Sequence, residues 1–311
     1  MNIDGLSNTD AAAGSQNTAQ IKIDTEEPSI SGSRAPAANG YGWNNVDVTA
    51  SFTASDSTSG LASVTSGGQT LTENSGSYQV IVSTEGTDQS VTATATDVAG
   101  NTNSATVANI NIDKTAPTVT YDSLPSPIIL NQPLSLTWHA SDDRSGIPAG
   151  SESGTITLDT SSVGSHTYTI TAGIVSDKAG NPSGAVTVTY SVIYNFGGFL
   201  PPINTQGHMS AFKKGSTIPV KFQLTDYDGN SISTATATIS LKWISGTIPT
   251  DIEPEAISTS AATTGNLFRY DSTGNQYIFN LATKTLSAPS VYQITATLDD
   301  GQSYSVSIGL R

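Results

Sequence analysis

The stretch Ala54-Ser55-Asp56-Ser57-Thr58-Ser59-Gly60-Leu61 returns further along the chain as Ala140-Ser141-Asp142-Asp143-Arg144-Ser145-Gly146-Ile147. In both copies an alternating apolar run ends in a loop that combines aspartate, serine and glycine. Self-similarity of this kind is the sequence signature of a repeated structural unit. The chain is therefore predicted to contain at least two tandem copies of one domain.

Two further landmarks recur in the same order. The turn Asp97-Val98-Ala99-Gly100-Asn101 returns as Asp177-Lys178-Ala179-Gly180-Asn181, and the closing stretch 23–28 returns as 112–117. Residues 10–24 resemble the end of the same unit. We therefore expect the sequence to begin inside a preceding repeat.

Between these landmarks apolar and polar residues alternate. The alternation is clearest at Val46, Val48, Ala50, Phe52 and Ala54, and again at Leu134, Leu136, Trp138 and Ala140. A period of two is that of a strand with one buried face, and it predicts that Trp138 lies in the core. Runs rich in Val, Ile, Thr and Tyr are bounded by turn residues, and helical spacing is nowhere sustained. Each repeat is predicted to be a β-sandwich of about seven strands.

Residues 195–311 break the repeat and form a third predicted β-sandwich. Pro201 and Pro202 cannot donate to a sheet ladder and predict an extended connector. Alternation then resumes, with Asp228-Gly229 and Asp300-Gly301 as predicted hairpin turns. The predicted organisation is a leading strand or tail of a preceding repeat at 1–23, repeats at 24–113 and 114–194, and a third domain at 195–311.

The composition narrows the class of protein. Only 12% of the 311 residues are charged, so uncharged polar residues supply most of the wet surface, as in all-β extracellular chains. The net charge of −14 disfavours nucleic acid and anionic membranes as partners. There is no cysteine and no apolar run long enough to span a membrane. The first basic residue is Lys22, so a signal peptide is not expected; the chain is a fragment or its signal has been removed.

These motifs resemble known families. The two central units resemble the Ig-like repeats of large bacterial and archaeal surface proteins, which often close with a stretch like 112–117 and carry an Asp-x-Ala-Gly-Asn turn. Residues 195–311 are similar to the PxKF domain, whose core run stands here as Pro219-Val220-Lys221-Phe222, preceded by 214–218 and followed by 298–301 and 310–311. The resemblance implies tandem Ig-like β-sandwiches, three domains in a row, in a secreted or wall-attached protein, and it implies no enzymatic activity.

The most informative group of candidate site residues is a set of aspartates. In an Ig-like sandwich the entering chain, the loop after the second strand and the turn between the last two strands lie at one end. Converging carboxylates repel one another unless a cation intervenes, and hard oxygen ligands suit calcium. The sequence therefore predicts a calcium clamp at each domain junction, whereas the alternative is that each aspartate only caps its own turn. The candidate ligands are Asp24, Asp56 and Asp97 in the first repeat, and Asp113, Asp142, Asp143 and Asp177 in the second.

No motif indicates catalysis. The run 226–230 superficially resembles an EF-hand loop, but position twelve would be Ala237 rather than Glu, so a hairpin turn explains it. His139, His166 and His208 stand in no catalytic motif, and short sandwiches offer little cleft for a pair of glycosidase carboxylates. We therefore expect a protein that is not an enzyme.

Aromatic side chains could stack on sugars, and the candidates are Tyr41, Trp43, Trp243, Tyr270 and Tyr277. Trp43 precedes a strand, where an aromatic ring more often covers the end of a sandwich. Lys221 could in principle form an isopeptide bond with an asparagine, but a solvent-facing strand lysine is the commoner explanation.

Taken together, the residues favour a non-catalytic structural or adhesive segment of an extracellular cell-surface protein, stiffened by calcium. Its partners would be neighbouring domains of a longer chain and a cell-surface glycan or protein. Two alternatives stay open. One is a carbohydrate-binding accessory region of a secreted enzyme, and the other is a self-assembling filament or layer subunit in which residues 1–24 complete a neighbour's sheet.

Overall fold

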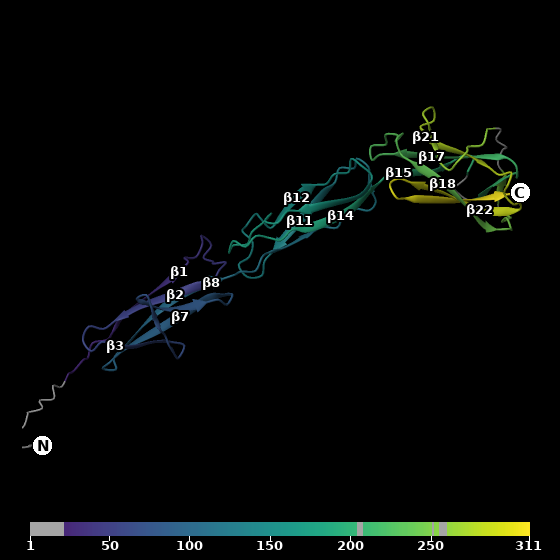
Figure 1. The fold of residues 1–311 in the computed structure, drawn as a ribbon. Helices are drawn as coiled ribbons and strands as arrows, with labels where there is room; N and C mark the ends of the chain where they lie inside the picture. Colours follow the sequence, from purple (N-terminus) through teal and green to yellow (C-terminus); the bar gives the residue numbers. More distant parts are fainter. Residues whose placement is uncertain (1–21, 204–207, 251, 255–259) are drawn as a thin grey trace, which may run out of the picture. The chain divides into compact units, whose positions relative to one another are not determined.

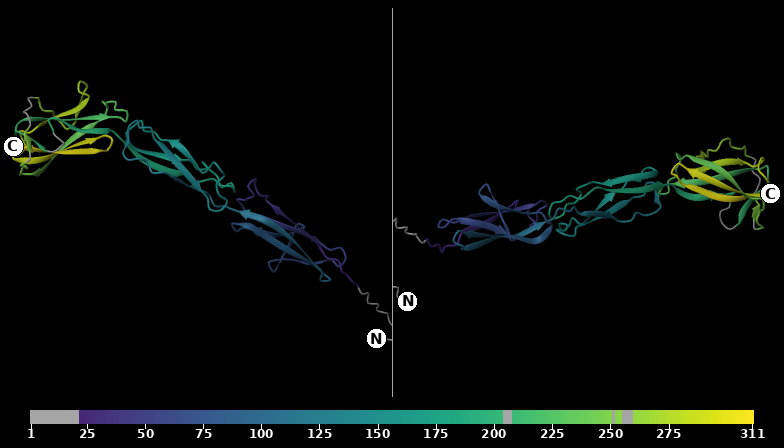
Figure 2. Two further views of the ribbon diagram at one scale, coloured as in Figure 1. Left: turned by 180° about the vertical axis from the view of Figure 1, so that it is seen from behind. Right: turned by 60° about the horizontal axis from the view of Figure 1, so that its bottom comes forward.

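The computed structural model describes residues 22–203, 208–250, 252–254 and 260–311 (Figure 1). Within these ranges the chain contains strands and turns and no helix. It divides into two compact units, Met1–Thr115 and Ala116–Arg311. The predicted all-β class of tandem Ig-like β-sandwiches is confirmed, whereas the exact domain limits stay a prediction. Figure 2 shows the packed sheets of each sandwich from two further directions.

The first unit holds one sandwich of two four-stranded sheets. Their orders are β1-β2-β6-β5 and β4-β3-β7-β8. Val48, Ala50 and Phe52 alternate inward along β2, as the period of two predicts, whereas Val46 precedes the strand and is exposed. The strands are β1 (Ser29–Ala35), β2 (Val48–Ser55), β3 (Leu61–Ser66), β4 (Gln69–Thr70), β5 (Glu73–Asn74), β6 (Ser77–Val82), β7 (Gly86–Asp97) and β8 (Thr102–Ile112).

The second unit begins with a smaller sandwich of two three-stranded sheets, β10-β14-β13 and β12-β11-β9. Trp138 is buried at the centre of β11, as predicted. Its indole packs against Gly154 on the neighbouring strand, where a Cβ atom would lie 2.8 Å from the ring. The strands are β9 (Thr118–Tyr121), β10 (Ile128–Ile129), β11 (Ser135–Ser141), β12 (Ser153–Thr157), β13 (Gly164–Ile170) and β14 (Val186–Ile193).

The second unit continues into a larger sandwich with sheets β15-β17-β21-β20 and β18-β22-β23-β16-β19. The predicted Asp300-Gly301 hairpin joins the paired strands β22 and β23. The predicted turn at Asp228-Gly229 also folds the chain back on itself, with Thr225 and Ser231 paired antiparallel across it, before the chain passes from β17 into the other sheet. The strands are β15 (Asn195–Leu200), β16 (Met209–Phe212), β17 (Thr217–Thr225), β18 (Ala237–Ser245), β19 (Ile252–Pro254), β20 (Arg269–Asp271), β21 (Gln276–Ala282), β22 (Ser290–Leu298) and β23 (Ser303–Leu310).

Hydroxyl groups pair across the outer faces of these sheets. On the first sandwich Thr92 faces Thr106 across β7 and β8, with the two hydroxyl oxygens 2.8 Å apart. On the third, Thr295 faces Ser305 across β22 and β23 at 2.7 Å. Cross-strand pairs of this kind stabilise a sheet without any charged group. They account for part of the low charge content seen in the sequence.

Candidate cation site of the first sandwich

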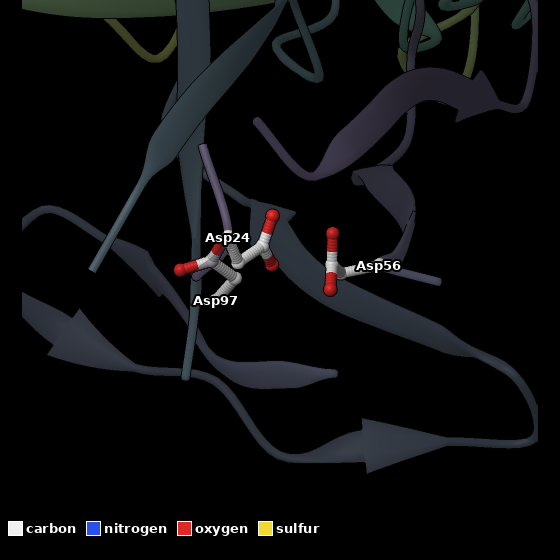
Figure 3. Close-up of side chains that lie close together, drawn as sticks. All are labelled: Asp24, Asp56 and Asp97. Atoms are coloured by element: carbon white, nitrogen blue, oxygen red, sulfur yellow. The ribbon is translucent and has the colours of Figure 1, made fainter. Parts of the chain in front are cut away.

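Three aspartates from distant parts of the chain meet at one end of the first sandwich. Asp24 precedes β1, Asp56 follows β2, and Asp97 ends β7. One carboxylate oxygen from each lies within 4.8 Å of the other two. Figure 3 shows the three side chains gathered together. The topology that the sequence predicted thus places these three residues in one cluster.

Asp56 organises its own loop. Its Oδ1 accepts hydrogen bonds from the backbone N–H groups of Thr58, Ser59 and Gly60 at 3.1, 2.8 and 2.7 Å. Gly60 adopts a φ of +90°, which favours glycine and explains why this residue closes the loop. The turn-capping alternative therefore describes Oδ1 of Asp56 correctly, but these bonds leave the second oxygen available.

Asp97 is buried in the turn between β7 and β8. Its Oδ1 accepts from the backbone N–H groups of Gly100 and Asn101 at 2.6 and 2.7 Å, and its Oδ2 accepts from the Asn101 side-chain amide at 2.8 Å. Burial opposes ionisation of this carboxyl, but the hydrogen bonds from Asn101, Gly100 and Ala99 outweigh burial and lower the pKa of Asp97. The carboxylate is therefore charged at neutral pH.

Asp24 brings the entering chain to the same end. Its Oδ1 accepts from the backbone N–H of Glu26 at 3.1 Å, and its backbone carbonyl accepts from the Asn101 side chain at 3.2 Å. Its Oδ2 is buried and has no hydrogen-bond partner in the structure. A buried carboxylate oxygen without a donor is costly, and a cation is one group that would satisfy it.

The donor set fits a hard divalent cation. The three acids supply carboxylate oxygens only. Calcium accepts 6 to 8 oxygen ligands in flexible geometry, so three carboxylates with carbonyls and water would suffice. The cluster contains no imidazole, and the chain has no cysteine, so ligands preferred by zinc or copper are lacking from it.

The second sandwich repeats two of the three turns. Asp142 Oδ1 accepts from the backbone N–H groups of Arg144 and Gly146, at 3.2 and 2.7 Å, as Asp56 does in the first sandwich. The carboxylate of Asp177 accepts from the backbone N–H of Gly180 and from both the backbone N–H and the side-chain amide of Asn181. Asp97 accepts the same set of bonds in the first sandwich.

Two further predicted ligands differ from these. Asp143 is exposed beside Asp142. Asp113 follows β8 in the first unit, where its carboxylate accepts from the backbone N–H of Thr115 at 3.1 Å. Because Asp113 and the other predicted ligands belong to different units, their convergence stays a prediction.

Sequence reasoning missed the amides that hold these acids. Asn101 and Asn181 each close the turn of the aspartate four residues earlier. Asp226 and Asn230 in the third sandwich repeat this pairing, with Asn230 donating to both carboxylate oxygens of Asp226. The signal was present, because the spacing Asp-x-x-Gly-Asn occurs in all three places.

The histidines make surface contacts. His139 pairs with Asp122 at 3.1 Å, and both side chains are at least half exposed. His166 stacks on Tyr190 with ring centroids 5.2 Å apart, and its Nε2 lies 2.8 Å from the Ser162 carbonyl. His208 is exposed in a loop.

The aromatic residues considered for stacking on sugars differ in their exposure. Trp243 on β18 and Tyr41 are 55% and 60% exposed, whereas Tyr277 is buried against Phe222 and cannot present its face to a sugar. Trp43 and Tyr270 are half-buried, as is Lys221. Of the leading segment proposed for self-assembly, residues 1–21 lie outside the described residues.

No protein-family model and no curated protein sequence matches this chain. Several solved structures resemble it. The N-terminal eight Ig domains of Down Syndrome Cell Adhesion Molecule give 13% identity and a TM-score of 0.35, covering 86% of this chain and 35% of that one. This chain therefore spans about a third of that fragment.

Extracellular domains 3–5 of Drosophila OTK give 10% identity and a TM-score of 0.24, covering 80% and 84% of the two chains. Domains 4 and 5 of the S-layer protein SbsC give 12% identity and a TM-score of 0.20, covering 62% and 98%. Likenesses of this strength transfer no function to this chain. Among the described residues, no helix has the length and apolarity needed to cross a membrane.

Proposed function

We propose that this chain is a non-catalytic structural or adhesive segment of a large extracellular cell-surface protein, in which calcium stiffens the ends of the sandwiches. The supporting observation is the cluster of Asp24, Asp56 and Asp97 together with the buried Oδ2 of Asp24, which has no donor. The resemblance of the last domain to PxKF domains, and of the repeats to bacterial and archaeal surface proteins, belongs to the same proposal.

The mechanism is mechanical rather than chemical. Asp24 lies on the chain that enters the sandwich, whereas Asp56 directly follows β2 and Asp97 ends β7, so the sheets fix both. A calcium ion held by all three would tie the entering chain to the sandwich end and restrict its bending. The repeated turns at Asp142 and Asp177 would do the same with Asp113 at the next junction.

Calorimetric titration of the full chain with calcium chloride tests this proposal. We expect heat of binding, and thermal unfolding of the first sandwich at higher temperature in calcium than in chelator. A ligand at 100 times its Kd stabilises the folded state by about 2.7 kcal/mol. Asp56→Asn retains the Oδ1 acceptor of the loop but removes one charge, so it should weaken binding while the loop survives.

Asp88→Asn is the matched control, because Asp88 is an exposed acid of the same sandwich with a φ of +51° that asparagine also tolerates. This variant should bind calcium like the parent. Absence of binding heat together with superimposable unfolding curves in calcium and chelator would remove calcium from the proposal.

A carbohydrate-binding accessory region is the second candidate, because Trp243 exposes 55% of its surface on β18. Retardation of the chain on insoluble glycans would support it if Trp243→Ala abolished the retardation and Trp43→Ala at the half-buried position did not. Unretarded migration of the parent chain would exclude the glycans that were tested.

A further inference from the structure

The second unit contains a joint between two sandwiches, and side chains from both sides meet there. The side-chain amide of Asn131, which follows β10, donates to Oδ2 of Asp226 at 3.0 Å. Beside it, the backbone N–H of Tyr227 donates to the carbonyl of Leu130 at 2.9 Å. These two bonds connect the loop after β10 in the second sandwich with the turn after β17 in the third.

A further contact involves the connecting chain itself. The backbone N–H of Tyr194 donates to Oδ2 of Asp300 at 2.9 Å, and burial together with the nearby Asp299 carboxylate raises the pKa of the Tyr194 hydroxyl. Tyr194 and Leu130 are both buried. One continuous apolar cluster runs from Val119 in the second sandwich to Leu310 in the third. Domains joined by a large apolar interface lose the relative motion that is otherwise expected of neighbours.

The acids at this joint are satisfied by protein donors. Asp226 Oδ1 accepts from the backbone N–H groups of Asp228 and Asn230, and its Oδ2 accepts from the side-chain amides of Asn230 and Asn131. The hydrogen bonds from Asn230 and Asn131 also hold the pKa of Asp226 below its usual value. Asp300 Oδ1 likewise accepts from the backbone N–H of Gln302 at 2.8 Å.

This arrangement contrasts with the first sandwich, where Asp24 Oδ2 is buried and lacks a donor. At the joint of the second unit an asparagine amide approaches the turn carboxylate, where the first sandwich places further carboxylates beside Asp97. The amide N–H donates a hydrogen bond to the carboxylate and so satisfies an oxygen that would otherwise need a cation or another donor. Turns with the same Asp-x-x-Gly-Asn pattern can therefore be completed by a neighbouring amide of the protein.

We propose that the second and third sandwiches form one rigid body whose joint is closed by Asn131, Tyr194 and Tyr227 without a metal ion. The proposal goes beyond calcium binding at the sandwich ends and does not depend on it. It implies that any calcium-dependent bending is confined to positions before residue 116. It also implies that the third sandwich keeps one orientation relative to the second.

Distance measurement between spin labels tests the joint directly. The chain has no cysteine, so Thr167→Cys and Ser272→Cys give two unique, exposed labelling sites on the second and third sandwiches. Pulsed dipolar spectroscopy on the full chain should give one narrow distance peak that is unchanged between calcium and chelator. Loss of the narrow peak in chelator would overturn the proposal.

Asn131→Asp probes the mechanism, because it replaces the donor to Asp226 with a second negative charge. Asn131 has a φ of +63°, a conformation that aspartate tolerates, so the backbone should survive the change. We expect loss of the narrow peak in this variant. Asn109→Asp is the control, since Asn109 is exposed, has a φ of +57° and lies in the first sandwich. A narrow peak retained in Asn131→Asp would contradict the role of Asn131.

A second pair of labels separates this inference from the proposed function. Thr92→Cys and Thr167→Cys place labels on the first and second sandwiches. If their distance distribution does not respond to calcium, the calcium proposal fails for that junction, while the inference about the later joint is judged only on its own pair of labels.

Discussion

The side-chain amide of Asn101 joins two aspartates, donating to Oδ2 of Asp97 at 2.8 Å and to the backbone carbonyl of Asp24 at 3.2 Å. It therefore holds the turn between the last two strands of the first sandwich to the chain that enters it. The same amide positions two of the three acids of the candidate cation site.

Asn101→Ala should destabilise the first sandwich, because Oδ2 of the buried Asp97 loses its side-chain donor. Leaving a buried acceptor unsatisfied costs about 1–3 kcal/mol. Denaturant unfolding of the full chain would measure the loss in the transition of the first sandwich. Asn45→Ala, at an exposed asparagine of the same sandwich, should leave that transition in place. Equal stability of the two variants would show that the amide contributes nothing.

Gly154→Ala should disturb the core of the second sandwich. A Cβ at Gly154 would lie 2.8 Å from atoms of the Trp138 ring, and that ring is buried. Overpacking of this kind typically costs about 1–3 kcal/mol. The loss would appear in denaturant unfolding and in the near-ultraviolet dichroism of tryptophan. Gly184→Ala, where nothing lies within 4 Å, is the control and should unfold like the parent.

Acid should weaken the third sandwich through Asp226. The side chains of Asn230 and Asn131 lower the pKa of this carboxyl from 3.8, so ionised Asp226 stabilises the folded state. That contribution is fully present above 3.8 and is lost as the pH falls through the lowered value. The free energy of unfolding, measured as the pH is lowered, should therefore fall less steeply in Asp226→Asn than in the parent. Asp228→Asn, which removes an exposed acid of the same turn, is the control for the loss of one charge there.

Alkali should weaken the same sandwich through Tyr277. Burial raises the pKa of its hydroxyl from 10.0 to about 12, and the hydroxyl donates to the Ile232 carbonyl at 3.0 Å. The stabilising contribution is complete below 10.0 and is lost as the pH rises through 12, because the unfolded chain releases this proton first. Tyr277→Phe should flatten that part of the stability profile. An unchanged profile would show that another group titrates there.

The sequence predicted the acid cluster of the first sandwich for a topological reason. The places of Asp24, Asp56 and Asp97 follow from the topology of an Ig-like sandwich, in which the entering chain, the loop after the second strand and the last turn lie at one end. Trp138 was assigned to the core from the alternation of apolar residues, and it is buried. Alternation over-extended one strand, since Val46 lies outside β2, where the preceding loop leaves it exposed.

The alternation of apolar residues could not predict contacts between sandwiches. Asn131 and Asp226 are 95 positions apart, and no periodicity indicates that an amide of one domain meets a carboxylate of the next. Tyr277 was a candidate for stacking on a sugar because it is aromatic, but its side chain is buried in β21. Tyr277, Ile278 and Phe279 are buried one after another in β21, so no alternation in the sequence marks which side of the sheet Tyr277 faces.

The hydroxyl pairs such as Thr92 with Thr106 and Thr295 with Ser305 have a consequence for the environment that this chain tolerates. Alcohol groups do not gain or lose protons in the range where carboxylates, imidazoles and amines do, and dissolved ions do not screen them. These cross-strand hydrogen bonds therefore depend neither on the protonation of a side chain nor on counter-ions.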